Sequence, residues 1–288
     1  MGPRIALQCA IHGFNVNLYD IIPDMLEKAK NWQKDNITDR VERGLLEEKD
    51  VEGTMSRINY FTDLNSAAGN ADFVIEAVPE NIELKRKVFA QLDEACPSHT
   101  ILSTNSSSIK SSLIASATKR PNKVLNTHFG LVVEDGRQYE VMGNSQTSEE
   151  TLKTAIALGH AIGLVPIPVR KEAIGFVYNR IWRAIKKAAM DIVDKGIASV
   201  EDVDRSWMAA RPGAEGPFIR MDKIGLDIIL AIEEQWYEDS GDPRDKPPKF
   251  LIDKVKKGEL GVKTSKGFYT YPHPAYEEPG WLTRAQTE

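Results

Sequence analysis

The sequence predicts an α/β domain with a doubly wound sheet, followed by an all-helical domain. Two observations support this fold class. Patterns of short apolar strands and amphipathic helices alternate as far as about residue 170, whereas only helical patterns follow. At the start of the chain, a glycine, a helix and a strand with an acidic end stand in the order of a dinucleotide-binding unit. We therefore expect two domains, residues 1–170 and residues 171–288.

The first helix follows Gly2, which stands where the last glycine of a GxGxxG loop would stand. Such a loop places a pyrophosphate on the helix N-terminus, so Gly2 is a candidate cofactor-binding residue of a Rossmann-like domain. The first strand and the first two glycines of that motif have no counterpart in the sequence. Because that strand is central in a doubly wound sheet, we expect unpaired backbone groups on its two neighbours. Two explanations stay open: a start further upstream, or a rebuilt sheet without redox chemistry.

Residues 14–20 alternate like a strand, and Asp20 ends this strand. A carboxylate at this place accepts hydrogen bonds from a ribose 2′-hydroxyl and disfavours a 2′-phosphate. The sequence therefore predicts NAD rather than NADP as the cofactor. Capping of the following helix is the alternative role for Asp20.

The other elements are predicted from their periodicity, in order along the chain. Runs of apolar and β-branched residues predict strands, and apolar repeats of helical spacing predict amphipathic helices. In the sheet domain we expect a helix at 22–46, a strand at 58–61, a helix at 63–69, a strand at 73–78, a helix at 81–95, strands at 100–104, 123–127 and 138–142, a helix at 148–161 and a strand at 164–169. In the helical domain we expect helices at 175–195, 200–210 and 217–239, and then a loop over 242–248.

Composition limits the classes of function. The 288 residues are 41% hydrophobic, which is enough for two moderate cores, and no apolar run approaches the roughly 20 residues of a membrane span. A formal net charge of −5 provides no basic surface for nucleic acid. Cys9 and Cys96 lack CxxC spacing and no secretory signal is present, so we expect a cytoplasmic protein with reduced thiols, with an organelle left open. Metal-ligand spacing is absent, so we expect no metal.

The first candidate for chemistry is His128, at the end of the strand 123–127. Ligands of parallel α/β sheets bind beyond the carboxyl ends of the strands, and a neutral imidazole is the commonest general base. Glu140 lies in the following strand, which could return antiparallel and bring its carboxylate beside the ring. Two unrelated strand residues are the alternative interpretation.

Two further candidates lie at the start of other elements. The polar run 103–108 directly follows a strand, and its hydroxyl groups could donate to a substrate oxygen or cap the next helix. Asn179 opens the helical domain, where a cleft between domains is expected; helix capping is its alternative role. The run lacks a GxSxG motif, which argues against a hydrolase nucleophile.

Together, five segments resemble the L-3-hydroxyacyl-CoA dehydrogenase family. They occur in the family's order and at family-like spacing, and they cover nearly the whole chain: residues 71–81, 103–108, 126–129, 175–180 and 261–269. The resemblance implies a Rossmann-like domain that binds NAD and a helical domain that forms a homodimer and closes over an acyl-CoA substrate. It implies an oxidoreductase of fatty-acid metabolism that interconverts 3-hydroxyacyl and 3-keto forms.

The same resemblance assigns roles to single residues. It implies that His128 is the general base, that Glu140 is its carboxylate partner, and that Ser107 and Asn179 contact the oxygen-bearing carbon of the substrate. On the cofactor side it implies a set of five residues: Gly2, Asp20, Glu80, Lys85 and Asn105. Glu80 and Lys85 would lie near the nicotinamide ribose.

One segment departs from the family's pattern. Between His128 and Glu140, the turn at 130–137 lacks the amide and the proline that the family carries after its catalytic histidine. Substrate specificity is therefore left open. A non-redox acid/base enzyme of specialised metabolism (an isomerase, cyclase or dehydratase) and a catalytically inactive binding protein are the alternatives to the dehydrogenase.

Overall fold

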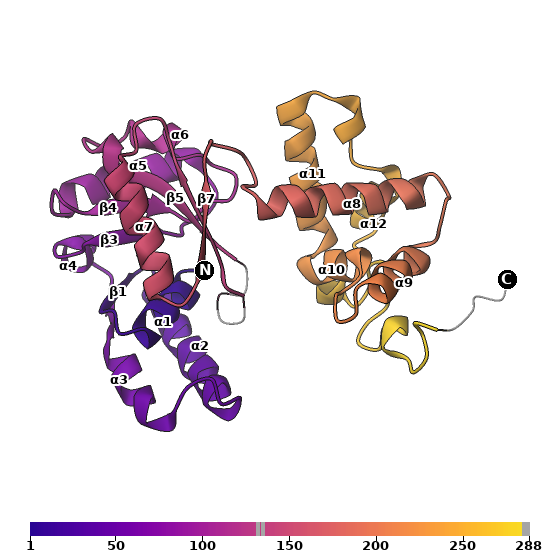
Figure 1. The fold of residues 1–288 in the computed structure, drawn as a ribbon, viewed down its shortest axis with the longest axis horizontal. Coiled ribbons are helices and arrows are strands. Elements are labelled where there is room, and N and C mark those ends of the chain that lie inside the picture. The colour runs from indigo at the N-terminus through magenta and orange to yellow at the C-terminus, as the bar shows by residue number, and fades with distance from the viewer. Residues whose placement is uncertain (131–132, 134–135, 284–288) are drawn as a thin grey trace. The chain divides into compact units, whose positions relative to one another are not determined.

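The structure is a computed structural model that describes residues 1–130, 133 and 136–283 (Figure 1). The chain divides into two compact units, Met1–Tyr178 and Asn179–Glu288. The first unit alternates strands and helices, and the described part of the second is built from helices and short turns. The predicted fold class, an α/β sheet domain followed by a helical domain, is confirmed.

The strands of the first unit form two sheets. In the smaller sheet, β1 (Val16–Tyr19) runs parallel to β2 (Ile58–Phe61). The larger sheet has the order β3 (Phe73–Glu76), β4 (Ile101–Thr104), β5 (Val124–Phe129), β6 (Gln138–Gly143) and β7 (Val165–Val169). Only the β5–β6 pair in it is antiparallel. Among the described residues, β1 and β3 each pair on one side, so each has an edge without a strand partner.

Helices cover both faces of the larger sheet. On one face, α1 (Gly2–Ile11) and α7 (Glu149–Ala161) pack on Leu125 and Tyr139. Gly159 of α7 makes this approach possible, because a Cβ there would lie 2.4 Å from the Tyr139 ring. On the other face, three helices pack around the side chains of Leu102 and Val124: α4 (Leu64–Ala68), α5 (Ile82–Ala95) and α6 (Ser112–Ala115). The sheet is therefore covered as a doubly wound fold requires.

The structure corrects several predicted bounds in the first unit. The helix expected at 22–46 is α2 (Pro23–Glu42), and it ends before Gly44, whose φ of 68° leaves the helical region. Short helical turns at 48–50 and 121–123, together with α3 (Val51–Ser56) and α6, were not predicted, because so few residues show no clear periodicity. In the turn at 130–137 that departs from the family's pattern, residues 131–132 and 134–135 lie outside the described residues.

The second unit packs its helices around one apolar cluster. The helices are α8 (Tyr178–Asp194, which begins at the last residue of the first unit), α9 (Val200–Ala210), α10 (Pro217–Ile224), α11 (Leu226–Ser240) and α12 (Lys249–Lys256). Phe218, Leu226 and Leu251 are buried at its centre. Short helical turns lie at 243–245, 262–264 and 275–277. The single helix expected at 217–239 is wrong: Gly225, with φ of 105°, separates α10 from α11.

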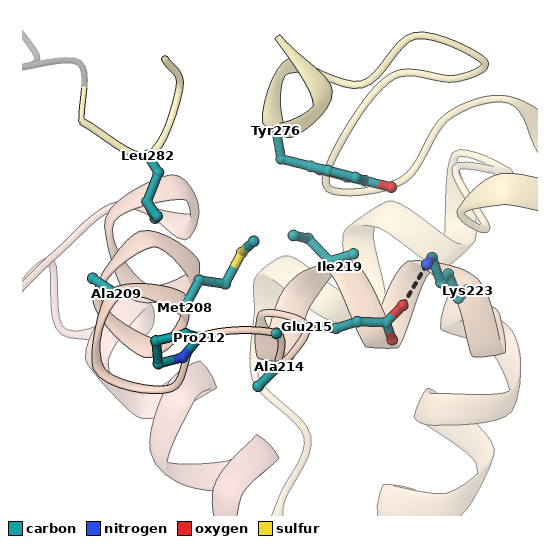
Figure 2. Close-up of a pocket in the computed structure, with 10 residues that line it drawn as sticks. Met208, Ala209, Pro212, Ala214, Glu215, Ile219, Lys223, Tyr276 and Leu282 are labelled. Atoms are coloured by element: carbon teal, nitrogen blue, oxygen red, sulfur yellow. Dashed lines mark hydrogen bonds and ion pairs between the residues drawn. The ribbon is translucent and has the colours of Figure 1, made fainter. Parts of the chain in front are cut away.

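An open cavity of about 430 Å³ lies within the second unit. Figure 2 shows Met208, Ile219 and Leu282 around it, with Tyr276 above and the ion pair between Lys223 and Glu215 at one side. Because the two charges at its edge already pair with each other, the cavity offers mainly apolar surface.

None of the helices in the described ranges is long and apolar enough to cross a membrane. Both cysteines are buried free thiols. Burial raises the pKa of Cys9 to about 12, which keeps this thiol protonated and unreactive.

Candidate active site

A histidine and a glutamate face each other across the antiparallel pair β5–β6. His128 and Glu140 are register partners, and Nδ1 of the ring lies 2.9 Å from Oε2 of the carboxylate. The return strand was one of two interpretations that the sequence left open, and the structure has that strand. The strand β5 extends to Phe129, so His128 lies within it rather than after its end.

Four N–H donors hold the carboxylate of Glu140, which is fully buried. Oε1 accepts from the backbone amides of Val177 and Tyr178, both at 2.9 Å. Oε2 accepts from His128 and from Nε2 of Gln138, also at 2.9 Å. Burial alone would raise the pKa of Glu140, but the hydrogen bonds from His128, Tyr178 and Val177 outweigh it and lower the pKa.

This hydrogen bonding assigns the protons of the histidine ring. An ionised carboxylate only accepts, so Nδ1 of His128 carries a proton and donates it to Glu140. In the neutral ring Nε2 then carries the lone pair, and no described residue donates a hydrogen bond to it. The arrangement can take up a proton at Nε2 and stabilise the resulting imidazolium through Glu140.

The segment around the start of α8 contacts both His128 and Glu140. Phe176 stacks on the ring of His128, with ring centroids 4.9 Å apart and an interplanar angle of 22°. Gly175 and Phe176 have φ values of 73° and 50°, and these two left-handed residues turn the next two amides toward Glu140. The sequence did not single out Phe176, although the glycine before it was a signal of a special turn.

The polar run after β4 reaches the same segment. The carbonyl oxygen of Ser107 accepts from the amide of Gly175 at 3.2 Å, and no described residue makes a hydrogen bond to the Ser107 hydroxyl. Asn105 accepts at Oδ1 from the amide of Phe129 at 3.0 Å, which ties this loop to the end of β5. Ser107 and the histidine are therefore joined through Gly175 and Phe176.

Glu80 and Lys85 form a second cluster beyond the end of β3. The ammonium group of Lys85, 1% exposed, lies 2.8 Å from Oε1 of Glu76 and 3.3 Å from Oε2 of Glu80. Ser106 and Ser108 donate their hydroxyl groups to Glu80. Burial would raise the pKa of Glu80, but these hydroxyls and Lys85 lower it. The sequence missed Glu76, whose Oε2 is buried without a partner in the described structure; its signal was a glutamate that ends an apolar strand.

Two family models match this chain, one for each half. Residues 1–173 match the 3-hydroxyacyl-CoA dehydrogenase NAD binding domain, and residues 175–271 match the 3-hydroxyacyl-CoA dehydrogenase C-terminal domain. The chain belongs to the 3-hydroxyacyl-CoA dehydrogenase family. It is therefore an oxidoreductase with NAD as its cofactor, as the sequence predicted.

Known relatives of this dehydrogenase cover almost its full length. It is 36% identical over 271 residues to the probable 3-hydroxybutyryl-CoA dehydrogenase of Bacillus subtilis, which covers 94% of each chain. It is 32% identical to the mitochondrial hydroxyacyl-coenzyme A dehydrogenase of Homo sapiens, over 94% of this chain and 88% of the human protein. The solved structure of (S)-3-hydroxybutyryl-CoA dehydrogenase from Ralstonia eutropha superposes with a TM-score of 0.88 at 32% identity, covering 95% of this chain and 96% of that one.

Several groups of this dehydrogenase fit NAD. The N-terminus of α1 has no side-chain cap and no acidic residue in its first turn, so its dipole is free to attract a pyrophosphate near Gly2. Asp20 accepts from the amide of Ile22 at Oδ1, and no described residue donates to its other oxygen. Asp20 does not cap α2, whose N-cap is Ile22 without a side-chain bond, so the capping alternative is wrong.

Asn179 of this dehydrogenase is the first residue of the second unit and lies in the first turn of α8. Its role toward the substrate stays a prediction. Among the described residues, no group of His, Cys, Asp and Glu could hold a metal ion.

Proposed function

We propose that this enzyme interconverts a 3-hydroxyacyl-CoA thioester and its 3-keto form, with His128 and Glu140 as the acid/base pair. The observation that carries the proposal is the 2.9 Å contact between Nδ1 of His128 and a fully buried carboxylate held by three further N–H donors. Such a carboxylate keeps its negative charge and its position while the ring gains and loses a proton. The reaction belongs to fatty-acid metabolism.

The residues of this chain would move the proton. A bound NAD would supply the acceptor for the hydride that leaves C3 of the hydroxyacyl substrate. Nε2 of His128 takes the proton of the 3-hydroxyl group, and Glu140 stabilises the imidazolium that forms. In the reductive direction the imidazolium returns this proton to the oxygen at C3.

Two polar groups would orient the substrate. The hydroxyl of Ser107 is without a hydrogen-bond partner in the described structure and would donate to the oxygen on C3. The side-chain amide of Asn179 would contact the substrate at the carbon that bears this oxygen, as the family resemblance implies. Phe176 would keep the ring of His128 from rotating away from the substrate.

The cofactor would be held by residues at the ends of three strands and by one helix. Gly2 would let the pyrophosphate approach α1, and Asp20 would accept from the adenosine ribose. Glu80 would face the nicotinamide ribose with its geometry fixed by Lys85, and Asn105 would hold the loop beside it.

We also propose a homodimer formed through the second unit. The buried ion pair between Lys186 and Glu233 joins α8 to α11. On these two helices Ile181, Ile228 and Ile232 are 56%, 46% and 39% exposed, which favours a covered face in an assembly. Sedimentation of the full chain tests this point, and a monomer at micromolar concentration would contradict it.

The proposed reaction is tested by the reduction of acetoacetyl-CoA with NADH, using the full chain and His128→Ala. The parent should turn over and the variant should lose roughly 10²–10⁴-fold in kcat. The exposed His160 provides a control, because His160→Ala should keep the parental rate. A His128→Ala variant as active as the parent would contradict the assignment. Free acetoacetate, assayed beside the thioester, shows whether the CoA moiety is required.

A further inference from the structure

We propose that Gln138 is a positioning residue that sets how strongly Glu140 stabilises the imidazolium of His128. This inference rests on the proposed function, because it assumes that the pair acts as an acid and a base. Nε2 of Gln138 and Nδ1 of His128 donate to the same oxygen, Oε2 of Glu140, each at 2.9 Å. The amide therefore competes with the ring for one carboxylate oxygen.

The strand geometry explains how Gln138 reaches this oxygen. Residues 138 and 140 lie two positions apart on β6, so their side chains point to the same face of the sheet. Gly130 donates its amide to the carbonyl oxygen of Gln138 and lies opposite it. A Cβ at Gly130 would lie 3.4 Å from Cβ and 3.5 Å from Oε1 of Gln138, so a larger side chain there would occupy the space of the amide. The glycine leaves room for Gln138 to fold toward Glu140.

Among the described residues around the ring, Glu140 is the charged group that contacts it. From β4, the neighbouring loop contributes Asn105, and the segment before α8 contributes Phe176; both side chains are neutral. Arg137, which directly precedes β6, is exposed. A hydrogen-bond donor to Glu140, such as Gln138, therefore acts on the negative charge that contacts the ring of His128.

The electrostatic consequence has a definite sign. A donor at Oε2 draws negative charge away from the hydrogen bond to Nδ1, so the carboxylate stabilises the imidazolium less. Without the amide, the ring should keep its proton to a higher pH. The oxidative reaction, which needs the neutral ring, should then begin at a higher pH than in the parent.

Three variants test the inference: Gln138→Leu, Gln138→Lys and Gln146→Leu. Gln138→Leu removes the donor, and its acid limb of kcat/KM for oxidation should move to higher pH. Gln138→Lys provides an N–H donor that also carries a positive charge. The acid limb of its kcat/KM profile should therefore lie at the same pH as that of the parent or at a lower pH. Gln146→Leu changes the same side chain at an exposed position and should leave the profile unchanged.

Proton NMR of the His128 ring, assigned with His128→Gln, separates the two proposals. If the ring titrates at a higher pH in Gln138→Leu, Gln138 acts on the pair even where no dehydrogenase activity is found, and only the proposed function fails. If the ring of Gln138→Leu titrates as in the parent while circular dichroism shows a folded chain, the inference about Gln138 is overturned. The inference would also be overturned if the pH profiles of kcat/KM moved in the same direction in Gln138→Leu and Gln138→Lys. Loss of the packing of Gln138 alone would explain such a result.

Discussion

Phe176 lies against the ring of His128 at a centroid distance of 4.9 Å, in a left-handed backbone conformation with φ of 50°. A bulky residue adopts this conformation only where its surroundings impose it. Here the conformation has two effects at once, because it turns the amides of Val177 and Tyr178 to Glu140 and buries the phenyl ring on the imidazole. One short segment thus positions both members of the pair.

Phe176→Ala should weaken both stability and catalysis. Loss of a fully buried phenyl ring costs about 3–5 kcal/mol of unfolding free energy. The freed imidazole should lower kcat by roughly tenfold or more, because a small displacement of a reacting group is costly. Urea unfolding and NADH-dependent turnover measure the two effects. Phe14→Ala, at a residue 38% exposed, is the control and should change neither by a comparable amount. Unchanged kcat in Phe176→Ala would show that the stack has no positioning role.

Acid should destabilise the first unit partly through Glu140. Its pKa in the folded chain lies below the usual value, despite burial, because of its N–H donors. The stability it contributes is therefore present above the pKa of the unfolded chain, near 4.3, and is lost as the pH falls through the folded value. Urea midpoints between pH 7 and pH 3 measure this loss.

The matched variant for this pH series is Glu140→Gln. At neutral pH it should be less stable than the parent by about 2 kcal/mol, because an amide cannot accept from all four donors. The difference should shrink below pH 4, where the parent's carboxylate takes up a proton. Glu150→Gln, at an exposed position of α7, should follow the parent throughout. A difference between Glu140→Gln and the parent that stays constant with pH would refute the electrostatic explanation.

Gly267→Ala should destabilise the second unit. An added Cβ would lie 2.1 Å from Oδ1 of Asp222, and this carboxylate accepts from the amides of Phe268 and Tyr269 at 2.9 Å. Since backbone and carboxylate fix each other, the clash should cost about 2 kcal/mol or more. Gly53→Ala in α3, where an added Cβ would lie 4.0 Å from the guanidinium group of Arg57, should be neutral or slightly stabilising. Equal unfolding midpoints for both variants would contradict the proposed clash.

The parts of the site that follow from one strand or one turn could be predicted from the sequence. The contact between His128 and Glu140 needs only an antiparallel return strand, which the two neighbouring predicted strands allow. In the described part of the chain, β1 and β3 each lack a strand partner on one edge, as the order of a doubly wound sheet predicts when its first strand is missing. In both cases the local pattern and the fold agree.

The parts that depend on a special backbone conformation could not be predicted. The apolar pattern at 217–239 continues through Gly225, yet φ of 105° there starts a new helix. The predicted helix at 175–195 begins only at Tyr178, because the two left-handed residues before it serve Glu140. The sequence places Gln138 only at the start of the predicted strand 138–142, because its hydrogen bond to Glu140 depends on the folded positions of both side chains. Such features depend on the three-dimensional fold, so the periodicity of the sequence does not predict them.

Asp20 should determine the choice between NADH and NADPH. Its Oδ1 holds the amide of Ile22, while no described residue donates to its second oxygen, which would accept from a ribose 2′-hydroxyl and repel a 2′-phosphate. Asp20→Ala should therefore reduce the preference for NADH in kcat/KM. Asp20→Asn keeps an acceptor for the amide of Ile22 but removes the negative charge. This variant therefore distinguishes an effect of the turn's conformation on cofactor preference from an effect of charge repulsion. If charge repulsion decides, the Asn variant loses the preference as the Ala variant does. Equal use of NADH and NADPH by the parent would contradict the role of Asp20.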